Sequence, residues 1–333
     1  MSKMETIRWG IIGCGDVTEV KSGPAFNKVE GSQLVAVMRR NLELAKDYAK
    51  RHGVPKYYNQ AENLINDPDI NAIYVATPPD SHAEYTIMAL KAQKPVYVEK
   101  PMALNYSQCE QMIETAKITG MPLFTAYYRR TLPGFLKVKE LIDDGVIGKV
   151  LSSSIQLFKQ PVAQELDQFN RSWRVLPEKA GAGLFFDLAS HQLDFFDFLF
   201  GPIVSCKGFA QNRGGYYDAE DTVSASFEFE NGVVASGNWS FVADSNSERD
   251  IMEIIGTKGR IVFSGFDHQP IKLYSRNKLV DFPYINPENI QYNLIKQIVE
   301  GLHGKSLCVS TGESAARTSR VMDQIVKNYY KKS

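Results

Sequence analysis

The stretch Val96-Tyr97-Val98-Glu99-Lys100-Pro101 decides the fold that we predict for this chain. Its apolar, β-branched residues are typical of a buried strand in a parallel sheet, and charged residues follow at the carboxyl end, where open α/β sheets bind ligands. Pro101 lacks a backbone donor and fixes its own φ, so the chain leaves the sheet there with Lys100 on a defined bend. Lys100 therefore lies either at the mouth of a ligand site or at an ordinary solvated strand exit.

Strands and helices alternate around this stretch through the first half of the chain. The predicted strands cover 7–12, 33–38, 71–76, 96–99 and 122–126. The predicted helices between them include 41–52, 81–92 and 107–120. This alternation indicates an α/β domain with a doubly wound parallel sheet over residues 1–126.

The first predicted strand runs into a glycine-rich turn, Gly13-Cys14-Gly15-Asp16-Val17-Thr18. A Gly-x-Gly turn between a strand and a helix suits a pyrophosphate, because backbone amides can approach it and the helix terminus favours negative charge. Thr18 stands where this fingerprint has Gly or Ala, which should loosen the helix-to-strand packing slightly. Gly23-Pro24 predicts a short or kinked helix. A plain strand-helix turn is the alternative.

Two arginines, Arg39 and Arg40, follow the second predicted strand. NAD-specific folds place an acidic residue here to accept the ribose hydroxyls, whereas a guanidinium group suits a 2′-phosphate. Met38 occupies the position where the acid would be expected, so we prefer NADP to NAD as the cofactor. The alternative is a pair of exposed arginines before a helix capped by Asn41.

The strand that ends near Ala76 breaks at Thr77-Pro78-Pro79-Asp80, and Ser81-His82-Ala83-Glu84 then predicts a capping box at the start of a helix. His82 can serve the cap or reach a ligand at the strand ends.

The pattern changes after Ala126, which predicts a second domain over residues 127–333. Residues 159–182 show little periodicity and read as a long, functional loop. Its Trp173 and Arg174 can stack on a ring or grip a phosphate, although a structural anchor explains Trp173 equally well. Asn231-Gly232 is a strong hairpin signal among strands, and amphipathic helices near 288–302 and 312–330 complete an α+β domain. One face of its sheet should pack on helices, and the other could be a subunit interface.

Residues 183–200 are apolar on nearly all sides, which predicts a buried helix. Asp187 and His191 nonetheless lie four residues apart on one face, with Asp194 a turn further on. Burying a carboxylate and an imidazole costs several kcal/mol unless they are paired or line a polar cavity. We expect this face to open onto a site. A hydrogen-bonded core pair is the alternative, and the spacing alone is weak support for a metal, so no metal is predicted.

Length and composition narrow the function classes. A chain of 333 residues is expected to form two domains, and its 38 basic and 38 acidic side chains, without a basic stripe, argue against nucleic acid as a partner. The four cysteines are far apart in sequence, which fits a reducing cytoplasm. We expect no signal leader and no membrane span, because no apolar run is long enough.

Five motifs now stand in order along the chain: Gly13-x-Gly15, Ala76-Thr77-Pro78, Glu99-Lys100-Pro101, Trp173-Arg174 and Asp187-x-x-x-His191. Together they make almost the whole chain resemble the Gfo/Idh/MocA family of NAD(P)-dependent oxidoreductases. The resemblance implies an amino-terminal Rossmann domain, followed by an α+β domain whose large, mostly antiparallel open sheet commonly mediates homo-oligomers, here a dimer or tetramer. It also implies a substrate among sugars, polyols and their keto forms, which predicts a carbohydrate or a cyclic diol.

The same resemblance assigns roles to residues. Lys100, Asp187 and His191 are the expected catalytic residues: His191 exchanges the hydroxyl proton, Lys100 stabilises the substrate oxygen, and Asp187 orients the substrate or the imidazole. The expected cofactor-binding residues are Gly13, Gly15, Asp16, Val17, Arg39, Arg40, Thr77, Pro78, His82, Glu99, Lys100, Trp173 and Arg174. Two other functions stay open, a glycosidase-like enzyme that uses its nicotinamide without net redox change and a non-catalytic NADP-sensing protein.

Overall fold

The structure, a computed structural model, describes residues 6–331 and divides the chain into two compact units. The first unit consists of Met1–Arg130 with Pro287–Ala316, and the second of Thr131–Asn286 with Arg317–Ser333. The chain therefore passes between the units three times. This corrects the prediction of a simple boundary between residues 126 and 127, because Pro287–Ala316 had been assigned to the second domain.

The returning segment belongs to the first unit because of its apolar face. Helix α11 (Tyr292–Leu302) buries Leu294, Ile295 and Ile298 among strand residues of the first sheet, including Trp9 and Tyr74. Its amphipathic pattern was visible in the sequence, but such a pattern does not specify the surface that covers the apolar face.

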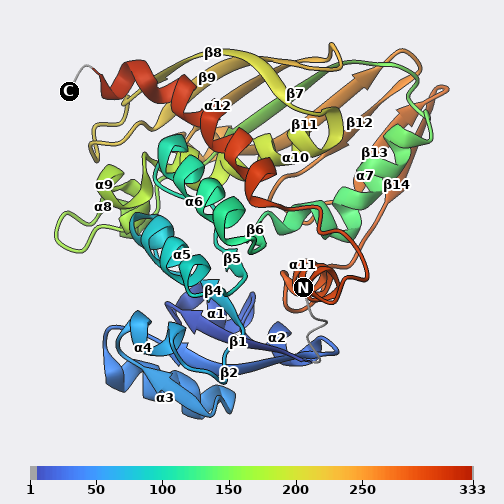
Figure 1. The fold of residues 1–333 in the computed structure, drawn as a ribbon. Helices are drawn as coiled ribbons and strands as arrows, with labels where there is room; N and C mark the ends of the chain where they lie inside the picture. Colours follow the sequence, from blue (N-terminus) through green and yellow to red (C-terminus); the bar gives the residue numbers. More distant parts are fainter. Residues whose placement is uncertain (1–5, 332–333) are drawn as a thin grey trace. The chain divides into compact units, whose positions relative to one another are not determined.

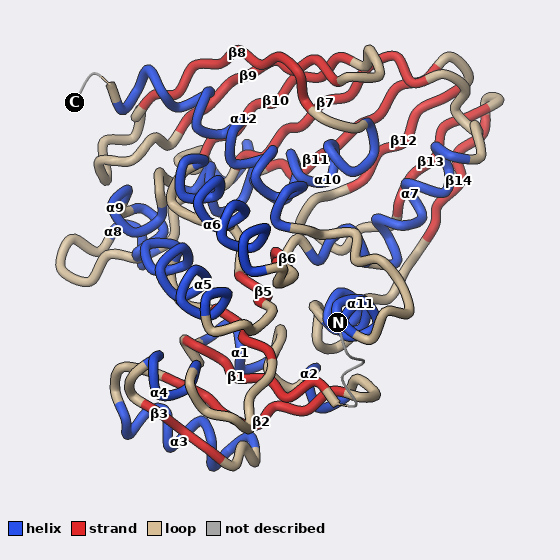
Figure 2. The backbone as a smooth tube through the Cα atoms, viewed as in Figure 1, coloured by secondary structure: helices blue, strands red, loops and turns tan. Residues whose placement is uncertain are grey.

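The first unit contains a six-stranded sheet with the order β3-β2-β1-β4-β5-β6, in which every pair of neighbours is parallel. Its strands are β1 (Ile7–Ile12), β2 (Ser32–Met38), β3 (Lys56–Tyr58), β4 (Ala72–Val75), β5 (Val96–Val98) and β6 (Leu123–Thr125). Its helices before the crossing are α1 (Asp16–Val20), α2 (Ala25–Lys28), α3 (Leu42–His52), α4 (Ala61–Ile65), η1 (Pro79–Ser81), α5 (His82–Lys91) and α6 (Tyr106–Thr119). Short strands and helices alternate here (Figure 2), as the sequence predicts for a doubly wound fold.

The strand order reverses between β1 and β4, because the chain builds outward from β1 first through β2 and then through β4. Such a switch point opens a crevice at the carboxyl ends of the two strands, where α/β proteins bind ligands. The glycine turn follows β1 and the Thr77-Pro78 break follows β4, so the fold brings these two predicted motifs to one edge of the sheet.

Local signals explain most helix ends in this unit. Asn41 caps α3 by accepting a hydrogen bond from the amide of Leu44, and Gly53 ends the helix with a left-handed φ of 65°. The capping box predicted at Ser81 is wrong: the Ser81 hydroxyl donates to Thr77 Oγ1 instead, because a 3₁₀ turn precedes α5.

The second unit contains an eight-stranded, mostly antiparallel sheet with the order β14-β13-β12-β11-β7-β10-β9-β8, in which only β7 and β10 pair in parallel. Its strands are β7 (Val150–Phe158), β8 (Ile203–Gln211), β9 (Thr222–Phe229), β10 (Val234–Ser240), β11 (Arg249–Gly256), β12 (Gly259–Phe263), β13 (Ile271–Ser275) and β14 (Lys278–Phe282). The hairpin predicted at Asn231-Gly232 joins β9 to β10 and is confirmed, with Gly232 at φ 83°.

Two long helices lie along one face of this sheet, α10 (Ser190–Phe200) and α12 (Gly312–Tyr330), the latter entering from the first unit (Figure 1). The shorter elements of the second unit are α7 (Pro133–Asp143), α8 (Ala163–Leu166), η3 (Trp173–Val175), α9 (Pro177–Ala180), η4 (Phe185–Ala189) and η5 (Ser245–Ser247), with η2 (Tyr128–Thr131) at the first crossing. Residues alternate along the strands between buried and exposed, so the other face of the sheet carries exposed side chains.

The buried helix predicted over residues 183–200 is not continuous. Phe185–Ala189 forms a π-helical turn, η4, and α10 begins after it. The predicted α-helical spacing of Asp187 and His191 is therefore corrected, because Asp187 lies in the π turn. Such π turns often occur at functional sites.

None of the helices within residues 6–331 has the length and apolar content needed to cross a membrane. All four cysteines are buried and carry free thiols.

Candidate active site

The backbone conformation and the close neighbours of residue 13 require a glycine there. Its φ is 94°, and an added Cβ atom would lie 2.7 Å from the backbone nitrogen of Thr77. The glycine turn after β1 is thus pressed against the loop after β4. At Gly15, by contrast, an added Cβ would meet nothing within 4 Å. Open space beside this backbone fits the predicted approach of a phosphate, although Gly15 has no positive φ that demands glycine.

The amides of the turn divide into two groups. Those of Gly13 and Cys14 donate to the carbonyl of Met38, which ties the turn to the end of β2. Those of Asp16 and Val17 lie in the first turn of α1, where no intrahelical acceptor exists. Both side chains are at least partly exposed, so these two amides suit the predicted phosphate contact.

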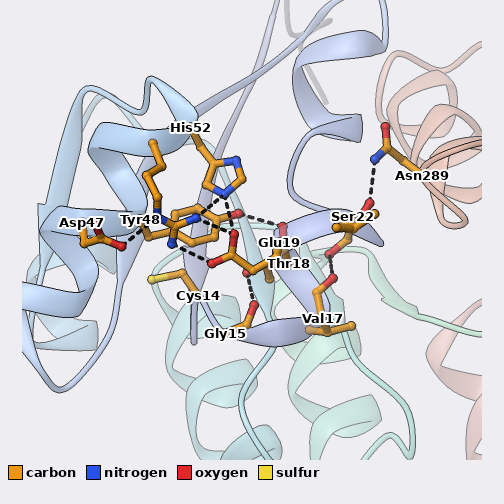
Figure 3. A network of polar contacts seen from close by, with 12 residues as sticks. Cys14, Gly15, Val17, Thr18, Glu19, Ser22, Asp47, Tyr48, His52 and Asn289 are labelled. Atoms are coloured by element: carbon orange, nitrogen blue, oxygen red, sulfur yellow. Dashed lines mark hydrogen bonds and ion pairs between the residues drawn. The ribbon is translucent and has the colours of Figure 1, made fainter.

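A network of polar contacts holds the short helix α1 against α3 (Figure 3). Thr18, fully buried, donates to the carbonyl of Gly15 at 2.7 Å, and the Tyr48 hydroxyl donates to the carbonyl of Thr18 at 2.8 Å. Arg51 makes a bidentate pair with Glu19 at 2.7 Å and 2.7 Å, which lowers the pKa of Glu19 to about 2. This partly exposed pair contributes about 1 kcal/mol or less, so it orients α1 more than it stabilises the fold.

Arg39 and Arg40 are both exposed directly after β2, as the sequence predicts. The guanidinium group of Arg39 donates to the carbonyl of Cys14 at 3.4 Å, and the backbone amide of Arg39 donates to the carbonyl of Tyr58. The side chain of Met38 is buried. The end of β2 therefore presents two cations and no carboxylate beside the glycine turn.

His82 is fully buried, and its two ring nitrogens lie 2.7 Å from the carbonyl of Thr77 and 2.9 Å from that of Pro101. His82 has no exposed surface in the structure, and a direct contact between His82 and a bound dinucleotide stays a prediction. His82 links the loop after β4 to the loop after β5 through these two carbonyls, which fixes the backbone next to Pro78 and Lys100. Burial lowers the pKa of His82.

Glu99 and Lys100 follow β5 and differ in exposure. Lys100 is partly exposed, while Glu99 is 6% exposed and its Oε1 accepts hydrogen bonds from Tyr74 and Gln291, each at 2.6 Å. Its Oε2 accepts the amide of Lys100 at 3.2 Å. A direct contact between Glu99 and a cofactor stays a prediction.

In the second unit, Arg174 and Asp187 form an ion pair. The Arg174 Nε donates to Asp187 Oδ2 at 3.1 Å, and the guanidinium lies 4.6 Å from the centre of the Trp173 ring. The loop predicted to be functional therefore reaches the π turn. It is not structureless as predicted, because α8, η3 and α9 lie within it.

His191 is the second residue of α10, just after the π turn, and is 3% exposed. Its ring lies edge-on to Phe266, with ring centres 6.2 Å apart. Phe266 is partly exposed, and Asp250 fixes its loop by accepting hydrogen bonds from the amides of Gly265, Phe266 and Asp267. An aromatic surface thus stands beside the predicted proton carrier.

The predicted residues form two sets. The first unit brings eleven of them to the ends of β1, β2, β4 and β5: Gly13, Gly15, Asp16, Val17, Arg39, Arg40, Thr77, Pro78, His82, Glu99 and Lys100. The second unit brings Trp173, Arg174, Asp187 and His191 to the π turn and its neighbours. That both sets share one site stays a prediction.

Sequence reasoning missed two buried groups that support these sets. Gln291 reaches Glu99, and Glu220 accepts hydrogen bonds from the amide of Gly183 at 3.0 Å and 3.1 Å. Neither lies in a motif, and the hydrogen bond from Gln291 to Glu99 spans 192 positions of sequence, so no local pattern pointed to them.

A parallel sheet with a glycine turn at its switch point is typical of a dinucleotide-binding protein of the Rossmann type. The model of an oxidoreductase family with an NAD-binding Rossmann fold matches residues 7–127, and that of the GFO/IDH/MocA C-terminal domain matches residues 135–262. The chain belongs to the Gfo/Idh/MocA family of NAD(P)-dependent oxidoreductases.

Individual relatives agree with this family. Oxidoreductase P35 of Formosa agariphila is 41% identical over 324 residues, covering 95% of this chain and 97% of that protein. Trans-1,2-dihydrobenzene-1,2-diol dehydrogenase of Bos taurus is 28% identical over 284 residues, covering 83% and 80%. The solved structure of levoglucosan dehydrogenase with NADH and levoglucosan shares the fold, with a TM-score of 0.87 at 22% identity and 98% of each chain covered.

Proposed function

We propose that this protein is an NADP-dependent dehydrogenase or reductase that interconverts a secondary alcohol and a ketone on a sugar, polyol or cyclic diol. The observation that carries the proposal is the position of Lys100 at the carboxyl end of β5. This strand neighbours β4, whose loop packs against the glycine turn, so an ammonium group stands beside the predicted dinucleotide crevice.

Each catalytic residue has a separate task in this proposal. A bound nicotinamide supplies the acceptor or donor of hydride at its C4 atom. The imidazole of His191 takes the hydroxyl proton during oxidation and returns it during reduction. Lys100 donates a hydrogen bond to the substrate oxygen and stabilises the negative charge that develops there. Asp187, oriented by Arg174, holds the substrate or the imidazole in place.

The substrate class rests on the relatives and on one ring. One relative is named for a cyclic diol, and one solved structure contains levoglucosan. Phe266, partly exposed beside His191, offers an aromatic face to the C–H groups of a ring-shaped substrate.

The preference for NADP rests on Arg39 and Arg40, which can bind a 2′-phosphate where Met38 offers no carboxylate to a ribose. Four buried free thiols support a reducing, cytoplasmic location. Phe209 and Ile251, two apolar side chains exposed on strands β8 and β11 of the eight-stranded sheet, support a homo-oligomer, because exposed apolar side chains can mark an interface.

A panel of sugars, polyols and cyclic diols tests the reaction, with NADP and NAD compared at the nicotinamide absorbance band. We expect Lys100→Met to abolish turnover on any substrate found, while the affinity for NADP stays within about threefold, because the ammonium acts on the substrate oxygen. Surviving turnover would refute the assignment of Lys100. Product formation without any absorbance change would instead indicate the glycosidase-like alternative.

A further inference from the structure

The segment that returns to the first unit brings Gln291 into the interior of that unit. Gln291 immediately precedes helix α11 and is fully buried. A buried primary amide is costly unless its groups are hydrogen-bonded. Its surroundings therefore show what this side chain is for.

The Gln291 amide bridges two side chains of strand β5 and its end. The amide nitrogen Nε2 donates to Glu99 Oε1 at 2.6 Å, and the amide oxygen Oε1 accepts from the Tyr97 hydroxyl at 2.7 Å. The Tyr74 hydroxyl on β4 donates to the same Glu99 oxygen at 2.6 Å, and the Tyr74 and Tyr97 rings stack with centres 4.8 Å apart. We call Gln291, Glu99, Tyr97 and Tyr74 the Gln291 cluster.

The direction of each hydrogen bond in the Gln291 cluster is determined. A flipped amide would place its oxygen 2.6 Å from a Glu99 oxygen, with two acceptors facing each other. Burial, with the Glu99 charge second, raises the pKa of Tyr74 and of Tyr97 well above the ordinary value, so both phenols keep the proton that they donate. The cluster therefore supplies Glu99 with donors only, which fixes the carboxylate in one orientation.

The oriented carboxylate of Glu99 in turn fixes the backbone of Lys100. Its second oxygen, Oε2, accepts the backbone amide of Lys100 at 3.2 Å. The return segment also holds the end of α1. The backbone amide of Gln291 donates to the carbonyl of Lys21, and Asn289 Nδ2 donates to the carbonyl of Val20. One short segment thus binds both the helix after the glycine turn and the strand end that carries Lys100.

We propose that Gln291 is a positioning residue for Lys100, acting through the Glu99 carboxylate. The proposal rests on the role of Lys100 proposed above, since a lysine without a catalytic task would need no such support. Gln291 sets the direction in which Lys100 leaves β5 relative to the glycine turn. Losing the amide frees the carboxylate to rotate, and the Lys100 backbone loses its acceptor.

A structural role alone would change stability without changing Lys100, so the test reads Lys100 directly. The protein is labelled by reductive ¹³C-methylation of its lysines, and the Lys100 signal is identified by its absence from Lys100→Met. We expect this signal to move in Gln291→Leu and in Tyr97→Phe, which removes the hydroxyl that orients the amide. It should stay in place in Gln297→Leu, a matched change on the same helix at a residue without contact to Glu99. This measurement needs no substrate.

The kinetic arm uses the substrate identified by the panel. We expect kcat of Gln291→Leu to fall about tenfold or more, with the NADPH dissociation constant within about threefold, because only the placement of the ammonium is lost. A folded Gln291→Leu with an unmoved Lys100 signal overturns the proposal, whatever the panel shows; if that variant does not fold, an unmoved signal in Tyr97→Phe does the same. If Lys100→Met is active while the Lys100 signal of the parent protein moves in Gln291→Leu, the catalytic role of Lys100 is refuted and the positioning of Lys100 by Gln291 stands.

Discussion

The carbonyl of Met38 receives the amides of Gly13 and Cys14, and the next two residues are Arg39 and Arg40. A dinucleotide bound by the glycine turn would therefore meet two guanidinium groups where its ribose lies. We expect the double variant Arg39→Ala with Arg40→Ala to raise KM for NADPH about tenfold or more, because each lost charge-assisted bond to a phosphate is worth about 1.5 kcal/mol or more. KM for NADH should change by less than about threefold. Steady-state kinetics with both cofactors measures the ratio.

The control for this change is Lys46→Ala, which removes one exposed positive charge from α3 without touching the strand end. It should leave both KM values near those of the parent protein. Equal losses for NADPH and NADH in the double variant would show that the arginines bind the dinucleotide without reading the 2′-phosphate.

At this scale, the sequence predicted residues whose chemistry depends on neighbours along the chain. The positive φ of Gly13 and the exposed position of Arg39 both follow from a strand ending in a turn. The burial of His82 did not follow, because it depends on carbonyls of Thr77 and Pro101 that only the folded sheet brings together.

Among elements, the segment from Gly183 to the end of α10 carries both Asp187 and His191 and is anchored by Glu220. Glu220 is fully buried, accepts the Gly183 amide, and accepts the Tyr330 hydroxyl of α12 at 2.5 Å. Burial raises the pKa of Glu220 from 4.5 to about 7. The start of the π turn is therefore held by a carboxyl group that changes charge near neutral pH.

The raised pKa makes stability depend on pH in a defined direction. Below about pH 4 the group is protonated in both states and has no effect; as the pH rises to about 7, only the unfolded chain releases the proton, so unfolding becomes easier. The loss is on the order of 3 kcal/mol and levels off above pH 7. We expect Glu220→Gln to remove this loss, so that the variant is more stable than the parent at pH 8. Denaturant unfolding from pH 5 to 8.5 measures the difference.

Glu228→Gln provides the comparison, because Glu228 is an exposed carboxyl group on the neighbouring strand β9. Its unfolding free energy should follow that of the parent at each pH. Parallel curves for the parent and Glu220→Gln would mean that Glu220 is ionised in the folded protein throughout this range.

Elements with strong periodic or turn signals were predictable, and irregular ones were not. The β9–β10 hairpin and the ends of α3 follow from Asn231-Gly232 and from Asn41 and Gly53. A π turn differs from an α turn by one residue per hydrogen bond, so a mostly apolar segment such as Phe185–Ala189 gives no sign of it. The Ser81 capping box failed because a 3₁₀ turn offered the hydroxyl a nearer partner.

Across the molecule, the open face of the eight-stranded sheet carries the predicted subunit interface. Phe209 on β8 is 79% exposed, and Ile251 on β11 lies in the same row of paired residues at 38%. We expect Phe209→Lys with Ile251→Lys to yield monomers with unchanged secondary structure, because the added positive charges on two facing copies of the sheet would repel each other. Light scattering after size exclusion, with far-ultraviolet circular dichroism, measures both properties.

Leu136→Lys is the matched control, since it adds a charge at an exposed apolar residue on α7 instead of on the sheet. It should keep the parental mass. A monomeric parent protein would refute the predicted oligomer, whereas a double variant that keeps an oligomeric parental mass would place the subunit contact elsewhere.

The number of domains was predictable from chain length, but their composition was not. Periodicity identified the helices near residues 288–302 and 312–330 without indicating which unit each would join. Contacts such as that between Gln291 and Glu99 decide the matter, and they exist only in three dimensions.

Because the chain passes between the units three times, neither unit is encoded by a single uninterrupted piece of the gene. A fragment that stops at Arg130 lacks the Gln291 amide, the Ser310 partner of Thr125 and the apolar residues of α11. Transferring the first unit of this protein into a relative therefore requires grafting two separated segments, because the amino-terminal segment alone lacks the later residues that complete its interior.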